Sequence, residues 1–95
     1  MAIAQIAGNY TLGQTPQFFE SGVTAITGKE IWCIQVTADC VFTTLTPAGT
    51  TVGIGTTNQN GDSVATKTFT AGQFLFGSWT GFTLASGEVI GHEAL

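Results

Sequence analysis

Charged side chains are scarce in this sequence. Asp, Glu, Lys and Arg make up 8% of its 95 residues, against about a quarter in an average soluble domain. Lys29 and Lys67 are the only basic residues, and arginine is absent. Nucleic-acid binding needs a cationic surface that displaces counterions, and anionic membranes attract basic clusters. With a net charge of −4, the sequence therefore argues against nucleic acid and membrane surfaces as partners.

Long apolar runs are also missing. No stretch approaches the roughly 20 apolar residues of a membrane span. The opening, MAIAQIAGNY, lacks the positive start of a secretion signal and is interrupted by Gln5, Gly8 and Asn9. We expect a protein that is not secreted and stays in the cytoplasm where it is made.

Metal-binding and acidic residues are few and scattered. Cys33 and Cys40 differ in parity along the chain, so on adjacent strands they would point to different faces. We expect two buried free thiols in a reducing compartment. Two cysteines and one histidine without close spacing make no zinc site, and we expect no metal and no cofactor. The sequence leaves open a carboxylate pair between Glu30 and Glu88, although no motif indicates one.

The C-terminal stretch 78–95, SWTGFTLASGEVIGHEAL, brings the single histidine, His92, close to Ser86 and Glu93. A nucleophilic serine needs a base, an orienting acid and an oxyanion hole, and the G-x-S-x-G elbow is absent. Gly87 instead favours a tight hairpin turn. We predict a terminal hairpin with His92 on the surface near its end. We therefore predict no catalytic residues and no enzyme.

Threonine, β-branched and aromatic residues dominate what remains, and glycine interrupts the chain throughout. No window shows a clean helical period, whereas short alternating runs are typical of strands. We predict an all-β fold, a small antiparallel β-sandwich or jelly-roll-like barrel of about seven or eight short strands. The expected strands are residues 18–20, 23–27, 30–37, 40–46, 65–69, 73–76, 81–84 and 88–92, with one more possible at 3–7.

The clearest expected strand is 30–37, EIWCIQVT, with Trp32, Ile34 and Val36 on one face. Apolar residues on both faces indicate a central strand, so we expect Trp32 in the core. The run 40–46 would follow as its antiparallel partner after a two-residue turn at Ala38–Asp39. Pro47 would end that run, because proline cannot donate to a strand ladder.

The chain divides into an N-terminal arm, 1–17, and one β-domain, 18–95. Between the expected strands, 48–62 is polar and carries the turn dipeptide Asn60–Gly61, so we expect either a long loop or a weak hairpin there. Elsewhere the surface is neutral, and little charge would have to be desolvated if protein covered it. We expect an oligomer or a larger assembly; the alternative is a monomer with a threonine-rich surface.

Aromatic residues offer a second kind of site, because exposed Trp and Tyr side chains stack on sugars in carbohydrate-binding β-domains. The candidates are Tyr10, Trp32 and Trp79. Trp79, between Gly77 and Gly81, is expected in a loop, either exposed or filling a subunit interface. A glycan-binding module is therefore an alternative function.

The last 30 residues or so, KTFTAGQFLFGSWTGFTLASGEVIGHEAL, resemble a pattern found in small virion proteins of tailed bacteriophages. The matching pieces are TFTAG, the aromatic stretch FLFGSWTGF, and LASGEVI near the end. These proteins resemble trimeric capsid decoration (cement) proteins. The resemblance implies an all-β, non-enzymatic virion protein made in the host cytoplasm, located on the outer capsid surface and bridging neighbouring subunits.

The partners implied by this resemblance are the major capsid protein and, in a homotrimer, other copies of the same chain. From the residues we expect the N-terminal arm and the QFF run to reach a neighbouring chain or the capsid. The alternative is a tail-fibre or receptor-binding module that stacks glycans on an exposed ring. The expected interface residues are Ile3, Ile6, Tyr10, Phe18, Phe19 and Trp79.

Overall fold

Two long strands dominate the computed structural model, which describes residues 14–50 and 52–94. Strand β2 runs over Ile31–Pro47 and β4 over Phe74–Glu93; β1, Gln17–Glu20, and β3, Thr68–Phe69, are short. The four strands form one sheet in the order β1-β4-β2-β3. The described residues contain no helix. The prediction of an all-β fold is confirmed, whereas a sandwich or barrel of seven or eight strands is not.

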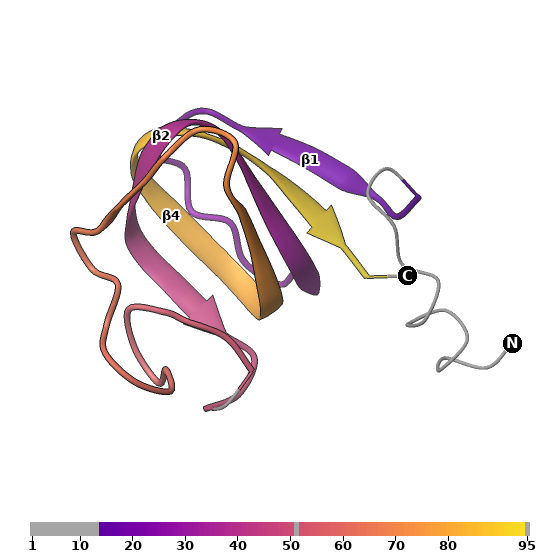
Figure 1. Cartoon of the computed structure of the whole chain (residues 1–95). Helices are drawn as coiled ribbons and strands as arrows, with labels where there is room; N and C mark the ends of the chain where they lie inside the picture. The colour runs from indigo at the N-terminus through magenta and orange to yellow at the C-terminus, as the bar shows by residue number, and fades with distance from the viewer. Residues whose placement is uncertain (1–13, 51, 95) are drawn as a thin grey trace, which may run out of the picture.

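The sheet is antiparallel and strongly curled. Along β2 the partner residue on β4 falls from Glu93 at Ile31 to Trp79 at Pro47, so the two strands run in opposite directions. Straight, the 20 residues of β4 would extend for about 66 Å, but the molecule measures 39 Å at its longest. Figure 1 shows how both strands bend to fit.

This bending places the two ends of β4 on opposite edges of the first half of β2. Gln35 of β2, for instance, pairs with Phe74 on one side and Ile90 on the other. Next to the C-terminal end of β4 lies β1, where Phe19 pairs with Ile90. Four strand segments therefore lie side by side, and they carry the surface described below.

The two predicted turns within β2 and β4 are wrong. Ala38–Asp39 and Ser86–Gly87 both lie inside continuous strands, and the two places face each other across the ladder. Two residues of β2, Asp39 and Cys40, oppose Gly87 alone, which is a β-bulge. Gly87 has φ 91°, and a side chain there would overlap the Asp39 carbonyl oxygen and Cys40 Cα. Both turn signals mark a shared bend and not a chain reversal.

Three further predictions are resolved in part. The run 23–27 forms only a single bridge, Ile26 with Phe82, and 65–69 contributes just Thr68–Phe69. β2 ends at Pro47 as predicted, and no strand occurs in the described residues between Pro47 and β3, which confirms the long loop. The possible strand at 3–7 lies outside the described residues.

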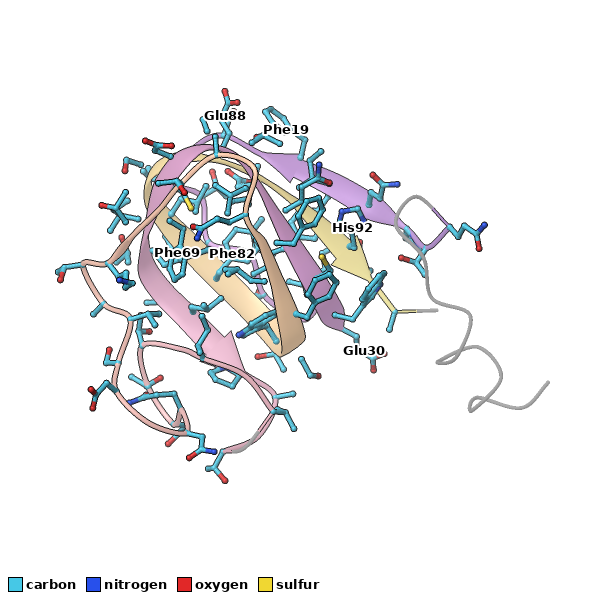
Figure 2. The ribbon with its side chains drawn as sticks, in the orientation of Figure 1. Phe19, Glu30, Phe69, Phe82, Glu88 and His92 are labelled. Atoms are coloured by element: carbon cyan, nitrogen blue, oxygen red, sulfur yellow. The ribbon has the colours of Figure 1, made fainter. Side chains whose placement is uncertain are left out.

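The core fills the inside of the curl. Trp79, at the bend of β4, has no exposed surface, and its indole Nε1 donates to the Ile54 carbonyl oxygen at 2.7 Å. Phe42 meets Phe69 and Phe82 edge-on, with ring centroids 5.7 and 5.6 Å apart. Figure 2 shows Phe69 and Phe82 within the curl. The buried aliphatic side chains around these rings come mainly from β2 and β4.

Candidate interaction surface

The outer side of the curled sheet carries side chains from four neighbouring strand segments. Residues directly opposite each other in a ladder point to the same side, so the register groups them into rows. One row consists of Phe74, Gln35, Ile90 and Phe19. The next consists of Phe76, Cys33, His92 and Gln17.

Three phenylalanines of these rows are open to solvent. Phe76 is 64% exposed, Phe19 58% and Phe74 39%. The rings of Phe74 and Phe76 stack, with centroids 6.3 Å apart, and Figure 2 shows Phe19 on the outside of the ribbon. We call Phe19, Trp32, Phe74, Phe76 and Ile90 the aromatic face. None of its members is charged, and it differs in this exposure from the buried rings of Phe42, Phe69, Trp79 and Phe82.

Trp32 joins this face because of a bulge. From Ile31 to Cys33, β2 advances two residues while its partner on β4 advances only from Glu93 to His92. Such a bulge disturbs the strict alternation of side chains. The prediction of Trp32 in the core beside Ile34 is therefore wrong. Its half-buried ring lies against Phe76 and His92, with centroids 6.1 and 6.0 Å away.

The N-terminal end of the described chain is fixed to the same place. Thr15 is 6% exposed, and its hydroxyl oxygen accepts a hydrogen bond from Trp32 Nε1 at 3.0 Å. One residue further, the Pro16 carbonyl oxygen accepts from the Glu93 amide at 2.7 Å. The chain therefore enters the fold at the margin of the aromatic face.

His92 lies beneath this face, and its prediction as a surface residue is wrong. It is 2% exposed because Gln17 of β1 and Cys33 of β2 flank it and Trp32 packs against it. His92 Nε2 and Gln35 Oε1 are 3.1 Å apart, and Nδ1 has no hydrogen-bond partner among the described residues. Burial lowers the pKa of His92, so the neutral ring donates through Nε2 to the glutamine.

Phe18 and Phe19, both expected at an interface, point to opposite sides of the sheet. Phe18 points inward, where it stacks on Phe82 with centroids 5.9 Å apart and covers Gly91. A side chain at Gly91 would overlap the Phe18 ring. Lys29 Nζ lies 5.3 Å from the centroid of the same ring. Phe18 is thus half-buried, and Phe19 is the member of the pair available to a partner.

Trp79 offers no surface to a partner. Its expected position in a loop is wrong, because it lies within β4 and pairs with both Ile31 and Pro47. Its complete burial removes it as an interface residue and as a sugar-stacking ring. Ile3, Ile6 and Tyr10, the other expected interface residues, lie outside the described part of the chain.

The polar residues of the C-terminal stretch do not assemble into a catalytic site. Ser86 pairs with Val41 and His92 with Cys33, eight residues apart along β2. Glu93 instead forms an ion pair with Lys29 at 3.7 Å. Figure 2 shows Glu30 and Glu88 at opposite ends of the ribbon, so these two carboxylates do not form a pair.

Both thiols are buried and free, as predicted. Burial raises the pKa of Cys33 to about 11, and burial together with the Asp39 carboxylate does the same for Cys40. Among residues 14–50 and 52–94, no group of three or more His, Cys, Asp and Glu side chains is placed to hold a metal ion. No helix long and apolar enough to cross a membrane occurs in that part of the chain.

A shallow hollow of about 230 Å³ lies on another part of the surface. Threonines dominate its lining, which also includes Gly28 and Gly81 and has no charged or nucleophilic group except hydroxyls. It has none of the convergent polar groups and titratable residues that mark an active site. The aromatic face is therefore the more informative surface.

Most residues of this face were not predicted from the sequence. Phe74 and Phe76 carry a signal that was available, since they alternate with Leu75 in QFLF and must point away from the side that Leu75 packs on. Ile90 and Phe19 are brought beside them only by the sheet register. A local pattern cannot show that four segments distant in sequence share one surface.

The fold and the surface together define an all-β protein with an uncharged, apolar face on the outside of its sheet. Comparison with protein-family models, curated proteins and solved structures finds no match for the chain. Its function must therefore be argued from this surface.

Proposed function

We propose that this chain is a non-enzymatic structural protein whose aromatic face docks onto another protein. The observation that carries the proposal is the exposure of the stacked pair Phe74 and Phe76, and of Phe19, on one uncharged side of the sheet. Exposed apolar patches mark interaction sites, and the centres of interfaces are rich in aromatic residues and poor in charged ones. Covering this face would release apolar surface from water at about 25 cal/mol per Å².

Within this class, we propose a capsid decoration protein on the outer surface of a bacteriophage virion. Three features support this: the resemblance of residues 67–95 to small phage virion proteins, the low charge, and the aromatic face. A protein that binds only the assembled shell stabilises it by mass action. The partner would be the major capsid protein, with the chain itself a homotrimer at a three-fold position.

The finer architecture that we propose for the domain is a small barrel. Both ends of β4 flank the first half of β2, so the curled sheet approaches closure. Among the described residues, the two short strands β1 and β3 stand at the two ends of the strand order. Short edge strands limit unwanted pairing with other sheets, which leaves the aromatic face as the main route to association.

The tail-fibre or glycan-binding alternative now needs a different stacking ring. It relied on an exposed Trp79, and that side chain is fully buried. Among the described residues the exposed rings are those of Phe19, Phe74 and Phe76, and phenylalanine lacks the polar atom that Tyr and Trp contribute at wet binding sites. We therefore favour protein docking.

Co-sedimentation with assembled shells tests the proposal. The major capsid protein encoded nearest to this chain is produced as shells and as unassembled subunits, and each is mixed with the wild-type chain. We expect the chain to sediment with shells, not to bind subunits, and to raise the temperature at which shells break. A Phe76→Ser variant should lose shell binding, while Val23→Ser, which removes an exposed apolar side chain elsewhere, should retain it.

Two outcomes would contradict the proposal. One is a wild-type chain that does not bind shells, or that binds them without changing their stability. The other is equal binding by the Phe76→Ser and wild-type chains, which would remove the aromatic face as the docking surface. Native mass spectrometry checks the trimer separately, and a glycan array identifies the alternative function.

A further inference from the structure

We propose that Asn60 and Gly61, in the loop between β2 and β3, form a site of spontaneous covalent modification. The backbone nitrogen of Gly61 attacks the side-chain amide of Asn60 and converts this asparagine into aspartate or isoaspartate without an enzyme. The reaction involves this chain alone, so it does not depend on the proposed capsid function. It takes place in a loop that has no part in the aromatic face.

The loop that carries this site is closed at its base by hydrogen bonds. The Val64 amide donates to the Gly55 carbonyl oxygen at 2.9 Å. Next to this bond, the Ser63 hydroxyl donates to the Thr56 carbonyl oxygen at 3.3 Å. Beyond the base, residues 57–62 belong to no strand. The backbone of this tip can therefore change its dihedral angles without breaking a strand ladder.

Both reacting groups are accessible at this tip. Asn60 and Gly61 are exposed, and neither the Asn60 side chain nor the Gly61 amide forms a hydrogen bond with any described residue. The Gly61 carbonyl oxygen accepts a hydrogen bond from Gln59 Nε2 at 3.1 Å, but this contact does not involve the attacking nitrogen. The two groups can therefore meet without first giving up a hydrogen bond to the protein.

Gly61 suits the reaction because glycine has no side chain to hinder the approach of its nitrogen and moves freely through positive φ. Its φ is 90°, and nothing lies within 4 Å of the position that a Cβ would occupy. Asn58 is exposed as well, but the next residue is Gln59, whose side chain is partly buried and bonded to the Gly61 carbonyl oxygen. Of the two asparagines in the described part of the chain, Asn60 is therefore the reactive one.

The reaction needs no reagent other than water. The Gly61 nitrogen loses its proton and bonds to Asn60 Cγ, while the bond from Cγ to the side-chain nitrogen breaks and ammonia leaves with that proton. The product is a succinimide ring. Water then adds to one of the two ring carbonyl carbons, the bond from that carbon to the ring nitrogen breaks, and the nitrogen regains a proton. Opening at Cγ gives aspartate, and opening at the main-chain carbonyl gives isoaspartate.

The consequence is one additional negative charge on a chain whose net charge is −4. The new carboxylate lies in an exposed loop, two residues from Asp62. Isoaspartate also lengthens the backbone by one methylene, but only at the loop tip, where such changes are best tolerated. The modified chain should therefore keep its sheet and its aromatic face and differ from the original chain in charge.

Incubation of the full chain in mildly alkaline buffer, which favours loss of the amide proton, tests the proposal. Isoelectric focusing should show a more acidic band that grows with time. Trypsin cleaves after Lys29 and Lys67, so a single peptide, 30–67, carries both Asn58 and Asn60. Fragment masses of this peptide should place the replacement of NH2 by OH at residue 60. Alkaline hydroxylamine, which attacks succinimides, should cut the chain directly after that residue.

Two matched variants connect the acidic band to this residue. Asn60→Gln should abolish the band, because glutamine would have to close a larger ring that forms much more slowly. Asn58→Gln should leave the band unchanged. Both side chains are exposed, so neither variant should disturb the fold, which the melting temperature checks. A band that survives Asn60→Gln, or a mass change located at residue 58, would overturn the proposal.

The same incubation in denaturant tests what the fold contributes. Because the loop leaves both reacting groups free, the folded chain should acquire the acidic band at a rate similar to that of the denatured chain. A folded chain that stays unmodified while the denatured chain reacts would mean that the structure protects Asn60, and it would contradict the proposal. No capsid shell enters these measurements, so their outcome and that of the shell-binding test are independent.

Discussion

The two sides of the curled sheet use the same side chain in opposite ways. Phe42 and Phe82, on the inside, are each 1% exposed and meet edge to face at 5.6 Å. Phe74 and Phe76, on the outside, also form a pair, but Phe76 is 64% exposed. The inner pair is enclosed by the bend of β2 and β4, and the outer pair faces solvent. An aromatic pair therefore contributes to stability or to recognition according to which side of the sheet it occupies.

Replacing an inner ring should have the largest effect. Phe82→Ala would leave a cavity against Phe18 and Phe42, and such changes cost about 3–5 kcal/mol. We expect the free energy of unfolding, measured by denaturant titration, to fall by this amount. A loss below about 1 kcal/mol would show that the inside of the curl is not the packed side.

A substitution at the bend of β4, at Gly87, should cause the next largest loss of stability. Gly87→Ala places a methyl group against the Asp39 carbonyl oxygen and Cys40 Cα at a positive φ, and strain of this kind costs roughly 1–3 kcal/mol. Ser86→Ala, beside it and exposed, serves as the control. Equal melting temperatures for the two variants would contradict the bulge.

Lowering the pH should reduce the free energy of unfolding through His92, by a smaller amount than these substitutions do. Burial lowers the pKa of His92 in the folded chain from the ordinary 6.5, so below that pH the unfolded chain binds a proton that the folded chain does not. The free energy of unfolding should therefore fall as the pH drops from 7.5 through 6.5 to 5.5, where carboxylates remain ionised. His92→Gln should lack this slope; an identical slope in the variant would assign it to another group.

Replacing an outer ring should change stability least. Phe76→Ala removes an exposed side chain, and such substitutions usually stay within about 0.5 kcal/mol. Denaturant titration should give nearly the wild-type midpoint, although Phe76→Ser is expected to abolish docking. A loss comparable to that of Phe82→Ala would mean that the outer face is part of the folded core.

Several features could be predicted from sequence because they depend on neighbours in the chain. The strand character of 31–37, 40–46, 74–76, 81–84 and 88–92 comes from residue type and alternation, as do the end of β2 at Pro47 and the polar loop that follows. The burial of Cys33 and Cys40 follows from the apolar runs around them. The absence of a nucleophile motif around Ser86 likewise needs no structure.

Other features depend on residues that are distant in the chain. The sequence predicts a turn at Ala38–Asp39 and another at Ser86–Gly87, because glycine and short polar residues favour bending. Whether such a bend reverses the chain or kinks a long strand depends on what lies opposite, and here the two bends face each other. The burial of Trp79 and His92 was missed for the same reason, since each is enclosed by strands far away in sequence.

The sequence by itself determined an all-β chain that is almost free of charge, with enough apolar residues to build a core and a surplus of aromatic rings. Only the tertiary structure decided which of these rings are left outside the core. Burial depends on the curl of β2 and β4, and the register of β1, β2 and β4 then brought Phe19, Phe74, Phe76 and Ile90 onto one uncharged outer face. Alternation assigns a side chain to one of two sides, but only long-range pairing determines which side is covered.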